Sequence, residues 1–373
     1  MRRRGVAAHF LLHPELAGSP PNEALISALL ELGLDVDLYA GGPAREAEQY
    51  GPRVRQRHVE YHSRWLARHA LSPRWRRYAL LSGTSELPMG VVGVLARLHR
   101  RPSMTLADEI RSGTYRGNAS ERWKRMCRAG MRRSDATIVN DPVRIDLQRE
   151  YAGLPPQHPV VSFPSCFRVL PEPGDRDSLR AARGIPQEAL VLGYSGLLSE
   201  ATGGLWLADA LASIDGLHVW ASVLGSDPLV AGLLQRVRGA ERLHLETERS
   251  PSWHAAWSKA ALADVGLVVY LQDAQAFRNV GVASNRLCMF LGMGIPVIAS
   301  RQPSFEFLER YECGRLVDRA EDLPAAVEAI AARLPAMRAN ALRCTREHIA
   351  APLRYETLRA TIARVLGREE AAV

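Results

Sequence analysis

The residues with the most specific chemistry in this sequence are Ser284, Asn285 and Arg286, which stand directly before an apolar helical pattern. Serine is a preferred helix cap, because its hydroxyl accepts hydrogen bonds from backbone N–H groups of the first turn. The N–H groups and the dipole of a helix start favour a bound anion. The guanidinium of Arg286 would add a donor fork that matches phosphate geometry. The spacing therefore predicts a phosphate site at residues 284–287.

The residues that follow must position this site. Leu287 and Phe290 recur at helical spacing and give the predicted helix an apolar face. Gly294 is expected to end the helix, and Pro296 opens a short apolar run at 297–299 that is typical of a buried strand. A helix start that follows a parallel strand lies at the carboxyl edge of the sheet, where such folds bind ligands.

Strands and helices alternate along the rest of the chain, which is typical of parallel α/β sheets. The chain has 373 residues, more than one hydrophobic core commonly holds. We therefore expect two Rossmann-like domains, over residues 1–165 and 185–350, with a linker at 164–188 that is rich in Pro, Gly and charge. Near its start the chain has three arginines and then a short apolar run, as a signal peptide would. His9 breaks this run and His13 stops it, so the run predicts a first buried strand rather than a signal peptide.

A net charge of +8 favours an anionic partner. Residues 52–80 are rich in Arg, interleaved with aromatic residues such as Trp65 and Trp75. Cations and amphipathic rings suit the headgroup region of an anionic membrane. The segment therefore predicts a membrane-facing surface, or else a solvated insertion that reflects an arginine-rich composition. Nucleic acid is not expected as a partner, because the chain has no recognised module and few aromatic residues for stacking.

No apolar run reaches the roughly 18 residues of a bilayer span. The five cysteines show neither metal nor redox spacing, which favours a reduced cytoplasmic protein. Binding of the arginine-rich segment 52–80 to anionic lipid would place the protein at the inner face of the membrane as a peripheral protein. No spacing of His and acidic residues suggests a metal site, so none is expected.

The stretch from Ala283 to Ser300 resembles a motif of family-four-like nucleotide-sugar glycosyltransferases of the two-Rossmann-domain (GT-B) class. The family often reads P-N-K-L-F-E-Y-M-A-A-G-x-P-V-V-A-S, and this chain reads A-S-N-R-L-C-M-F-L-G-M-G-I-P-V-I-A-S. The order of elements is similar along nearly the whole chain. The resemblance implies an α/β fold of two Rossmann-like domains that face each other across a cleft. It also implies that a helix at about 352–366 packs back on the first domain.

The function implied by the resemblance is hexosyl transfer. The second domain would hold a nucleotide-diphosphate sugar, and the first would hold a hydroxyl acceptor. A lipid-linked or small-molecule acceptor would place the protein in cell-surface glycan or natural-product biosynthesis. Beyond the sugar nucleotide as co-substrate, no cofactor or metal is expected, because this class generally needs no metal.

The donor-binding residues implied are glycines of the loop 193–204 and polar residues near the phosphate site: Gly196, Gly203, Arg278, Asn279, Ser284, Asn285 and Arg286. Gly203 and its neighbour are expected to present N–H groups at a helix start, although a plain tight turn would use the same residues. Arg278 and Asn279 fit a solvated loop equally well.

Two departures from the family weaken the donor site. Leu197 and Thr202 stand where the family has an Arg and a Lys that grip the diphosphate. Met289 and Val282 stand at the positions of a pair of Glu residues. These losses leave open a second function, that of a catalytically inactive GT-B protein with a binding or assembly role.

The first domain of the family carries P-V-V-x-x-x-H-D on its central strand, and Asp108 takes the place of the His here, followed by Glu109. A carboxylate at a strand end could take the proton of the acceptor hydroxyl as a general base, which suits an inverting displacement. Pairing with a nearby arginine is the alternative. Acceptor contacts are expected at His13, Gly18 and Tyr115, although a structural role for His13 would also fit.

Overall fold

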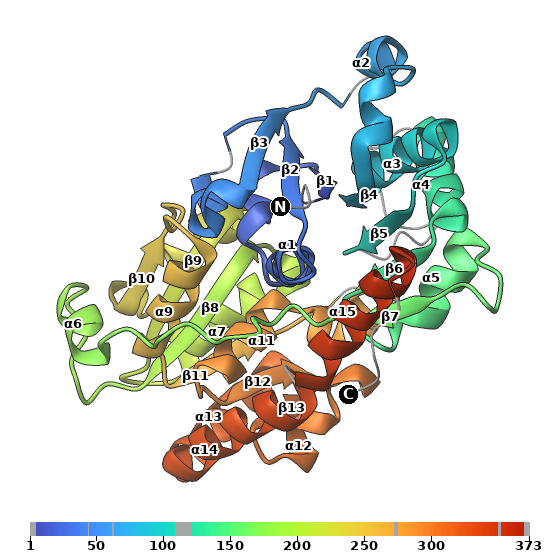
Figure 1. The fold of residues 1–373 in the computed structure, drawn as a ribbon. Helices are drawn as coiled ribbons and strands as arrows, with labels where there is room; N and C mark the ends of the chain where they lie inside the picture. The colour runs from blue at the N-terminus through green and yellow to red at the C-terminus, as the bar shows by residue number, and fades with distance from the viewer. Residues whose placement is uncertain are drawn as a thin grey trace. The chain divides into compact units, whose positions relative to one another are not determined.

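The computed structural model describes residues 5–43, 45–61, 63–108, 121–271, 275–349 and 352–368. The chain forms two compact units (Figure 1). Unit 1 comprises Met1–Arg168 with Pro352–Val373, and unit 2 comprises Val169–Ala351. Each unit is built on a parallel β-sheet, as the alternation of strands and helices predicts.

The sheet of unit 1 has the strand order β3-β2-β1-β4-β5-β6-β7, and its pairings are parallel. Its strands are β1 (Val6–Leu11), β2 (Asp35–Ala40), β3 (Val54–His58), β4 (Tyr78–Thr84), β5 (Ser103–Ala107), β6 (Ala136–Val139) and β7 (Val160–Ser162). Its α-helices are α1 (Pro20–Glu31), α2 (Ser63–His69), α3 (Glu86–His99), α4 (Glu121–Arg133), α5 (Arg144–Ala152) and α15 (Pro352–Val365). Short 3₁₀ turns are η1 (Pro14–Gly18), η2 (Arg45–Arg53) and η3 (Pro73–Arg77).

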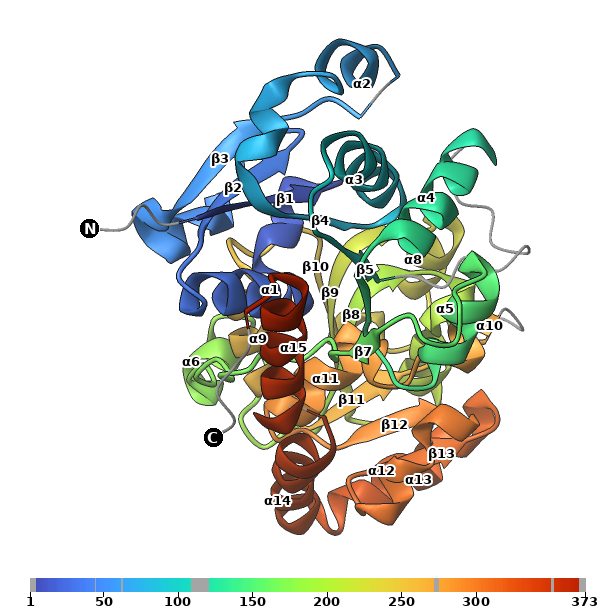
Figure 2. The ribbon, with the colours of Figure 1, turned by 45° about the vertical axis from the view of Figure 1, so that its right-hand side comes forward.

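The strand order of unit 1 reverses between β1 and β4, which is where doubly wound sheets bind ligands. α15 packs beside α1 (Figure 2), and Tyr355, Leu358 and Ile362 of α15 belong to the core under the β1–β2 region. α15, the last helix in the described part of the chain, therefore completes unit 1.

A buried polar group interrupts the apolar strand β1. His9 has no exposed surface, and its ring nitrogens lie 2.9 Å from Ser82 Oγ and 2.9 Å from Asn22 Oδ1. Burial lowers the pKa of His9 to about 4, so the ring is neutral near pH 7. His9 is thus a satisfied core histidine that ties β1 to β4 and α1.

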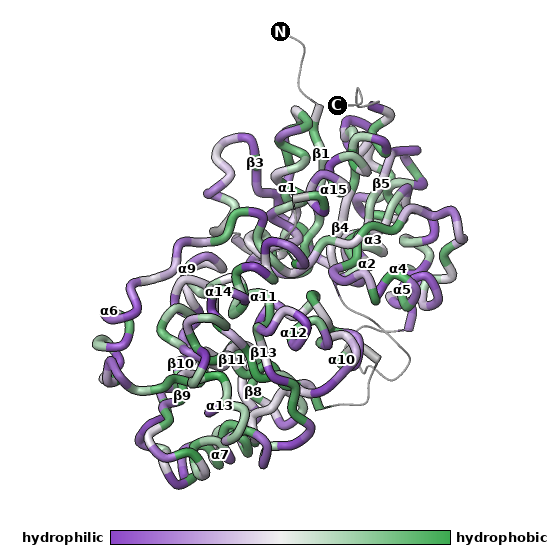
Figure 3. Tube along the Cα trace, turned by 90° about the horizontal axis from the view of Figure 1, so that it is seen from below, coloured by the Kyte–Doolittle hydropathy of each residue, from purple (hydrophilic) through white to green (hydrophobic). Residues whose placement is uncertain are grey.

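The arginine-rich segment 52–80 divides into an exposed and a buried part. β3 is an edge strand whose last four residues are exposed, and it is strongly hydrophilic in the hydropathy-coloured trace (Figure 3). Trp65 and Trp75 are instead buried in a cluster that includes Phe10 and Tyr39. The expectation that both tryptophans face a membrane is wrong, because their rings fill the core beside β1 and β2.

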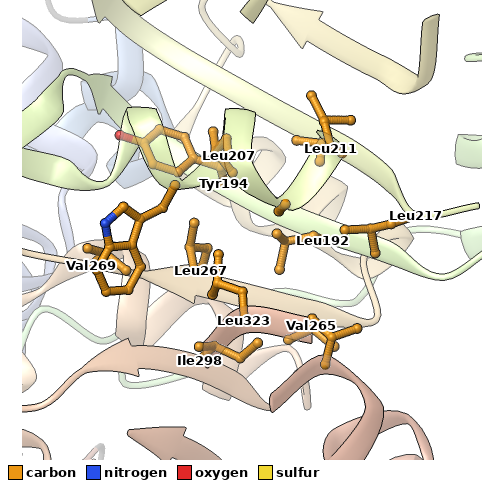
Figure 4. Packing of buried hydrophobic residues seen from close by; sticks show 14 of the residues in the cluster. Leu192, Tyr194, Leu207, Leu211, Leu217, Val265, Leu267, Val269, Ile298 and Leu323 are labelled. Carbon is orange, nitrogen blue, oxygen red and sulfur yellow. The ribbon is translucent and has the colours of Figure 1, made fainter. Parts of the chain in front are cut away.

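Unit 2 has the strand order β10-β9-β8-β11-β12-β13, also parallel throughout its pairings, with its reversal between β8 and β11. Its strands are β8 (Val191–Leu198), β9 (His218–Ser226), β10 (Leu243–Glu246), β11 (Val265–Val268), β12 (Val297–Ser300) and β13 (Gly314–Val317). Leucine and valine side chains from β8, β11 and α7 form its main core (Figure 4).

The α-helices of unit 2 are α6 (Arg176–Ala181), α7 (Gly204–Ser213), α8 (Pro228–Leu234), α9 (Trp253–Lys259), α10 (Gln275–Arg278), α11 (Asn285–Gly292), α12 (Phe307–Arg310), α13 (Leu323–Ala331) and α14 (Leu334–Cys344). A π-helical turn, Thr345–Ile349, follows α14. The 3₁₀ turns are η4 (Glu200–Thr202), η5 (Ala240–Arg242), η6 (Ala260–Leu262), η7 (Gly281–Ala283), η8 (Pro303–Phe305) and η9 (Ala320–Asp322). In the described ranges, no helix combines the length and apolar character needed to cross a bilayer.

Candidate functional site

The start of α11 has the form that the sequence predicts. Ser284 Oγ accepts from the backbone N–H of Leu287 at 3.1 Å, and Tyr270 Oη lies 2.8 Å from the same oxygen. Within the described part of the chain, the N–H groups of Asn285 and Arg286 are bonded to no acceptor. Two adjacent amides and the positive end of the helix dipole therefore remain for a ligand.

Arg286 is placed differently from the expectation. Its side chain is buried, with 6% of the residue exposed. Nε donates to Ser195 O at 2.5 Å, and Nη1 donates to Thr202 O at 3.1 Å. The guanidinium carbon lies 4.0 Å from the ring centroid of Tyr194. Arg286, the second residue of α11, thus binds backbone carbonyls of the glycine loop, which is the segment 193–204.

Among the described residues, the charge of Arg286 has no counter-ion. Its guanidinium contacts backbone carbonyls and the rings of two tyrosines, and the ion pairs of the described residues include none with Arg286. A buried charge is normally paired, because desolvation is otherwise strongly unfavourable. A buried, unpaired guanidinium from the same helical turn that carries two free amides therefore favours an anionic ligand at this edge of the sheet.

The glycine loop is closed by its own hydrogen bonds. The side chain of Thr202, which is buried, donates to Leu197 O at 2.7 Å and bonds Ser199 at the other end of the turn. Gly203 N–H donates to Glu200 O at 3.0 Å, and Gly204 N–H donates to Ser199 O at 2.8 Å. The expectation that these two amides present N–H groups to a ligand is wrong, because the turn itself uses both.

Gly203 and Gly196 have conformational roles. Gly203 has a φ of 86°, and a Cβ there would lie 2.7 Å from the Cβ of Val269. Gly196 has a φ of 110°, and a Cβ would lie 3.4 Å from Nη2 of Arg286. Both glycines allow the loop to approach its neighbours closely. Their contact with a donor remains a prediction.

The remaining donor candidates differ in exposure. Asn285 is exposed at the first position of α11, beside the free amides. Arg278 is exposed and Asn279 is half-buried, both just before η7, where Ser304 Oγ donates to Arg278 O at 3.2 Å. Ser284 is occupied as the helix cap, so Asn285 is the polar side chain best placed to meet a ligand at the helix start.

A second polar cluster lies at the carboxyl edge of the unit 1 sheet. Ser85 Oγ donates to Asp108 Oδ2 at 2.8 Å. The backbone carbonyl of Asp108 accepts from Asn140 Nδ2 at 2.9 Å and from Arg144 Nη1 at 3.1 Å. Asp108 is half-buried. Polar groups after β4 and β6 therefore hold the predicted general base from both sides.

Two of the candidate acceptor residues are described. His13 is exposed directly before η1, and Gly18 is buried at the end of that turn. Glu109 and Tyr115 lie outside the described residues. The assignment of these four positions remains a prediction.

Several residues of these sites were missed at the sequence level. In unit 1 they are Ser85, Glu86, Asn140 and Arg144, all of which are buried. In unit 2 they are Tyr194 and Tyr270, which contact the Arg286 guanidinium. Ser85 and Asn140 follow directly after β4 and β6, so a survey of strand ends would have found these two, whereas Glu86 and Arg144 begin the next helices. The described residues contain no group of three or more His, Cys, Asp or Glu side chains that could hold a metal ion.

The sequence matches no family model and no curated protein. Solved structures are similar over nearly the full length. Sucrose-phosphate synthase from Thermosynechococcus elongatus is 17% identical with a TM-score of 0.71, covering 97% of this chain and 98% of its own. HepE from Anabaena in complex with UDP-glucose is 15% identical with a TM-score of 0.73, covering 96% and 99%. WaaG, a glycosyltransferase involved in lipopolysaccharide biosynthesis, is 14% identical with a TM-score of 0.65, covering 94% and 98%.

Proposed function

The chain has the GT-B fold, and we propose that it transfers a hexosyl group from a nucleotide-diphosphate sugar to a hydroxyl acceptor. HepE, which has the same fold, was solved with UDP-glucose, and WaaG is a glycosyltransferase of lipopolysaccharide biosynthesis. These proteins support a role in cell-surface glycan biosynthesis, with natural-product glycosylation as the alternative setting.

The observation that carries this proposal is the buried guanidinium of Arg286, in the first turn of α11. Its charge lacks a carboxylate partner among the described residues, and the amides of Asn285 and Arg286 are free there. A diphosphate would complete this arrangement, because its negative charge meets two N–H donors, the helix dipole and the guanidinium. The same groups would stabilise the nucleoside diphosphate as it leaves.

Unit 1 would supply the acceptor half of the reaction. Asp108 is proposed to take the proton of the acceptor hydroxyl. His13, Gly18 and Tyr115 are proposed to contact the acceptor, which would be a lipid-linked or small-molecule alcohol. No metal ion is proposed in the reaction, because the free amides and the guanidinium would provide the positive potential at the leaving group.

The direct test is titration calorimetry with UDP, GDP, ADP and dTDP, followed by transfer assays with the matching hexose donors. Binding of at least one nucleoside diphosphate, with release of the nucleotide in the presence of an alcohol acceptor, is expected. Failure of all four nucleotides to bind at millimolar concentration would reject the donor site.

A second function is favoured by the glycine loop itself. Thr202 is buried where the family has a diphosphate-binding Lys, and Leu197 is 55% exposed where the family has an Arg. A GT-B protein that binds a sugar nucleotide without turnover would show these losses. Nucleotide binding without hydrolysis or transfer for any donor would support this binding or assembly role.

A further inference from the structure

Ser85 adopts a backbone conformation that is unusual for any residue but glycine. Its φ is 73° and its ψ is 169°. Arg100 also has a positive φ, but its φ of 51° and ψ of 50° are the ordinary left-handed values at the end of α3. The region occupied by Ser85 is essentially restricted to glycine and costs about 1–3 kcal/mol for other residues. Such strain persists where the surroundings impose it.

The hydroxyl of Ser85 also forgoes its usual local role. Ser85 is the N-cap of α3, where a serine side chain normally accepts from N–H groups of the first turn. Here it makes no such cap and donates instead to Asp108 Oδ2 at 2.8 Å. The backbone is held in this position by the Ser85 N–H, which donates to Leu106 O at 3.2 Å. The chain therefore gives up two local stabilising features to direct one hydroxyl at Asp108.

Asp108 is also fixed through its main chain. Asn140 Nδ2 and Arg144 Nη1 both donate to the carbonyl of Asp108, and Arg144 Nη1 lies 3.0 Å from Asn140 Oδ1. Asn140 and Arg144 are 5% and 4% exposed. Three buried side chains from the segments that follow β4 and β6 thus hold Asp108 at the end of β5, Ser85 through the carboxylate and the other two through the backbone carbonyl. This is the arrangement that a positioned catalytic group requires.

We propose that Ser85 is a positioning residue that fixes the carboxylate rotamer of Asp108 for proton transfer from the acceptor. This inference rests on the proposed glycosyl transfer. In the step, the acceptor O–H bond breaks and its proton passes to the Asp108 carboxylate. The acceptor oxygen bonds to the anomeric carbon, while the bond from that carbon to the diphosphate oxygen breaks and its electron pair leaves with the nucleoside diphosphate.

The test separates orientation from folding. Ser85→Gly removes the hydroxyl but suits the backbone, so its melting temperature should equal or exceed that of the parent protein. Its kcat should fall about 10- to 100-fold with an unchanged KM for the donor, because a misplaced group of this kind slows the chemical step on that scale. Ser85→Ala should show the same kinetic loss. Ser252→Gly, which removes an ordinary cap in unit 2, is the matched control and should leave kcat unchanged.

A double variant and a pH profile complete the test. Ser85→Gly in an Asp108→Asn background should cause no further loss, since the hydroxyl acts through the carboxylate. The acidic limb of the pH profile of kcat/KM should shift in Ser85→Gly. If the parent protein transfers sugar and Ser85→Gly keeps its rate and profile, the inference fails and the proposed function stands. If the parent protein transfers no sugar from any donor, both fail.

Discussion

Replacement of Arg286 by methionine tests the donor site most directly. Methionine keeps much of the apolar length of the side chain but removes the charge and all five N–H donors. The carbonyls of Ser195, which is part-buried, and Thr202, which is buried, then lose their donor. The free amides at the start of α11 also lose the nearby guanidinium charge.

The structure sets the size of both effects. Each buried carbonyl left without a donor costs about 1–3 kcal/mol, and the stacking of the guanidinium on Tyr194 adds about 0.5–2 kcal/mol. Unit 2 should therefore lose about 2.5–8 kcal/mol of unfolding free energy. The affinity for a nucleoside diphosphate should fall by about 1.5–3 kcal/mol, equivalent to about 10- to 150-fold in Kd, the scale of a charge-assisted bond.

Thermal unfolding and calorimetric titration with UDP, GDP, ADP and dTDP measure the two effects. Arg286→Lys keeps the charge with fewer bonds, so it should recover part of the affinity and less of the stability. Arg236→Met is the matched control, because Arg236 is exposed on the same unit. An Arg286→Met protein with the melting temperature and nucleotide affinity of the control would refute the role given to the guanidinium.

Three further predictions address other features. In a Glu23→Gln background, which removes a carboxyl whose raised pKa of about 7 acts with the opposite sign, the contribution of His9 to the unfolding free energy should fall by about 3 kcal/mol between pH 6.5 and pH 4. The reason is that His9 becomes protonated near its ordinary pKa in the unfolded state, but only near pH 4 in the folded state. Other histidines whose pKa is lowered by burial, such as His244 and His254, should add to this fall. An unfolding free energy from urea titrations that does not change with pH would contradict this prediction. Leu197→Arg, at an exposed position, should tighten nucleoside diphosphate binding severalfold in calorimetry, whereas Thr202→Lys should lower the melting temperature by several degrees because Thr202 closes the loop from a buried position; the reverse ranking would rule out this account of the loop. Through its exposed arginines, the segment 52–80 should co-sediment with anionic vesicles at low salt and be released by salt, independently of Trp65 and Trp75; absence of sedimentation at low salt would leave the segment as a structural feature.

The parts of the molecule that the sequence predicts well are those determined locally. The cap at Ser284, the end of α11 near Gly294 and the strand after Pro296 depend on neighbouring residues, and all three agree with the structure. The alternation of strands and helices likewise predicts two parallel sheets. These features follow from capping, backbone freedom and apolar spacing within a few residues of each other.

The roles that depend on distant contacts were not predictable in this way. Arg286 donates to Ser195 O, which lies 91 positions earlier in the chain. Its local setting at a helix start indicated a ligand contact and could not show that the side chain is buried against the glycine loop. Trp65 and Trp75 stand among arginines, yet both pack into the core beside β1. Composition indicates which residues are amphipathic, but the tertiary fold decides which part of each residue is buried.

The residues in which the glycine loop differs from the resembled glycosyltransferase motif can be explained together with the position of Arg286. In the glycosyltransferases that this loop resembles, an Arg and a Lys grip the diphosphate, whereas here Leu197 and Thr202 occupy those positions and the buried guanidinium of Arg286 donates to loop carbonyls. A buried charge acts through a medium of lower effective dielectric than water, so its potential reaches the free amides of α11 with less screening. The guanidinium of Arg286 also fixes the loop by donating to the carbonyls of Ser195 and Thr202. Under the proposed function, this single arginine would supply both the rigidity of the loop and the positive potential at the diphosphate, without the two exposed cations.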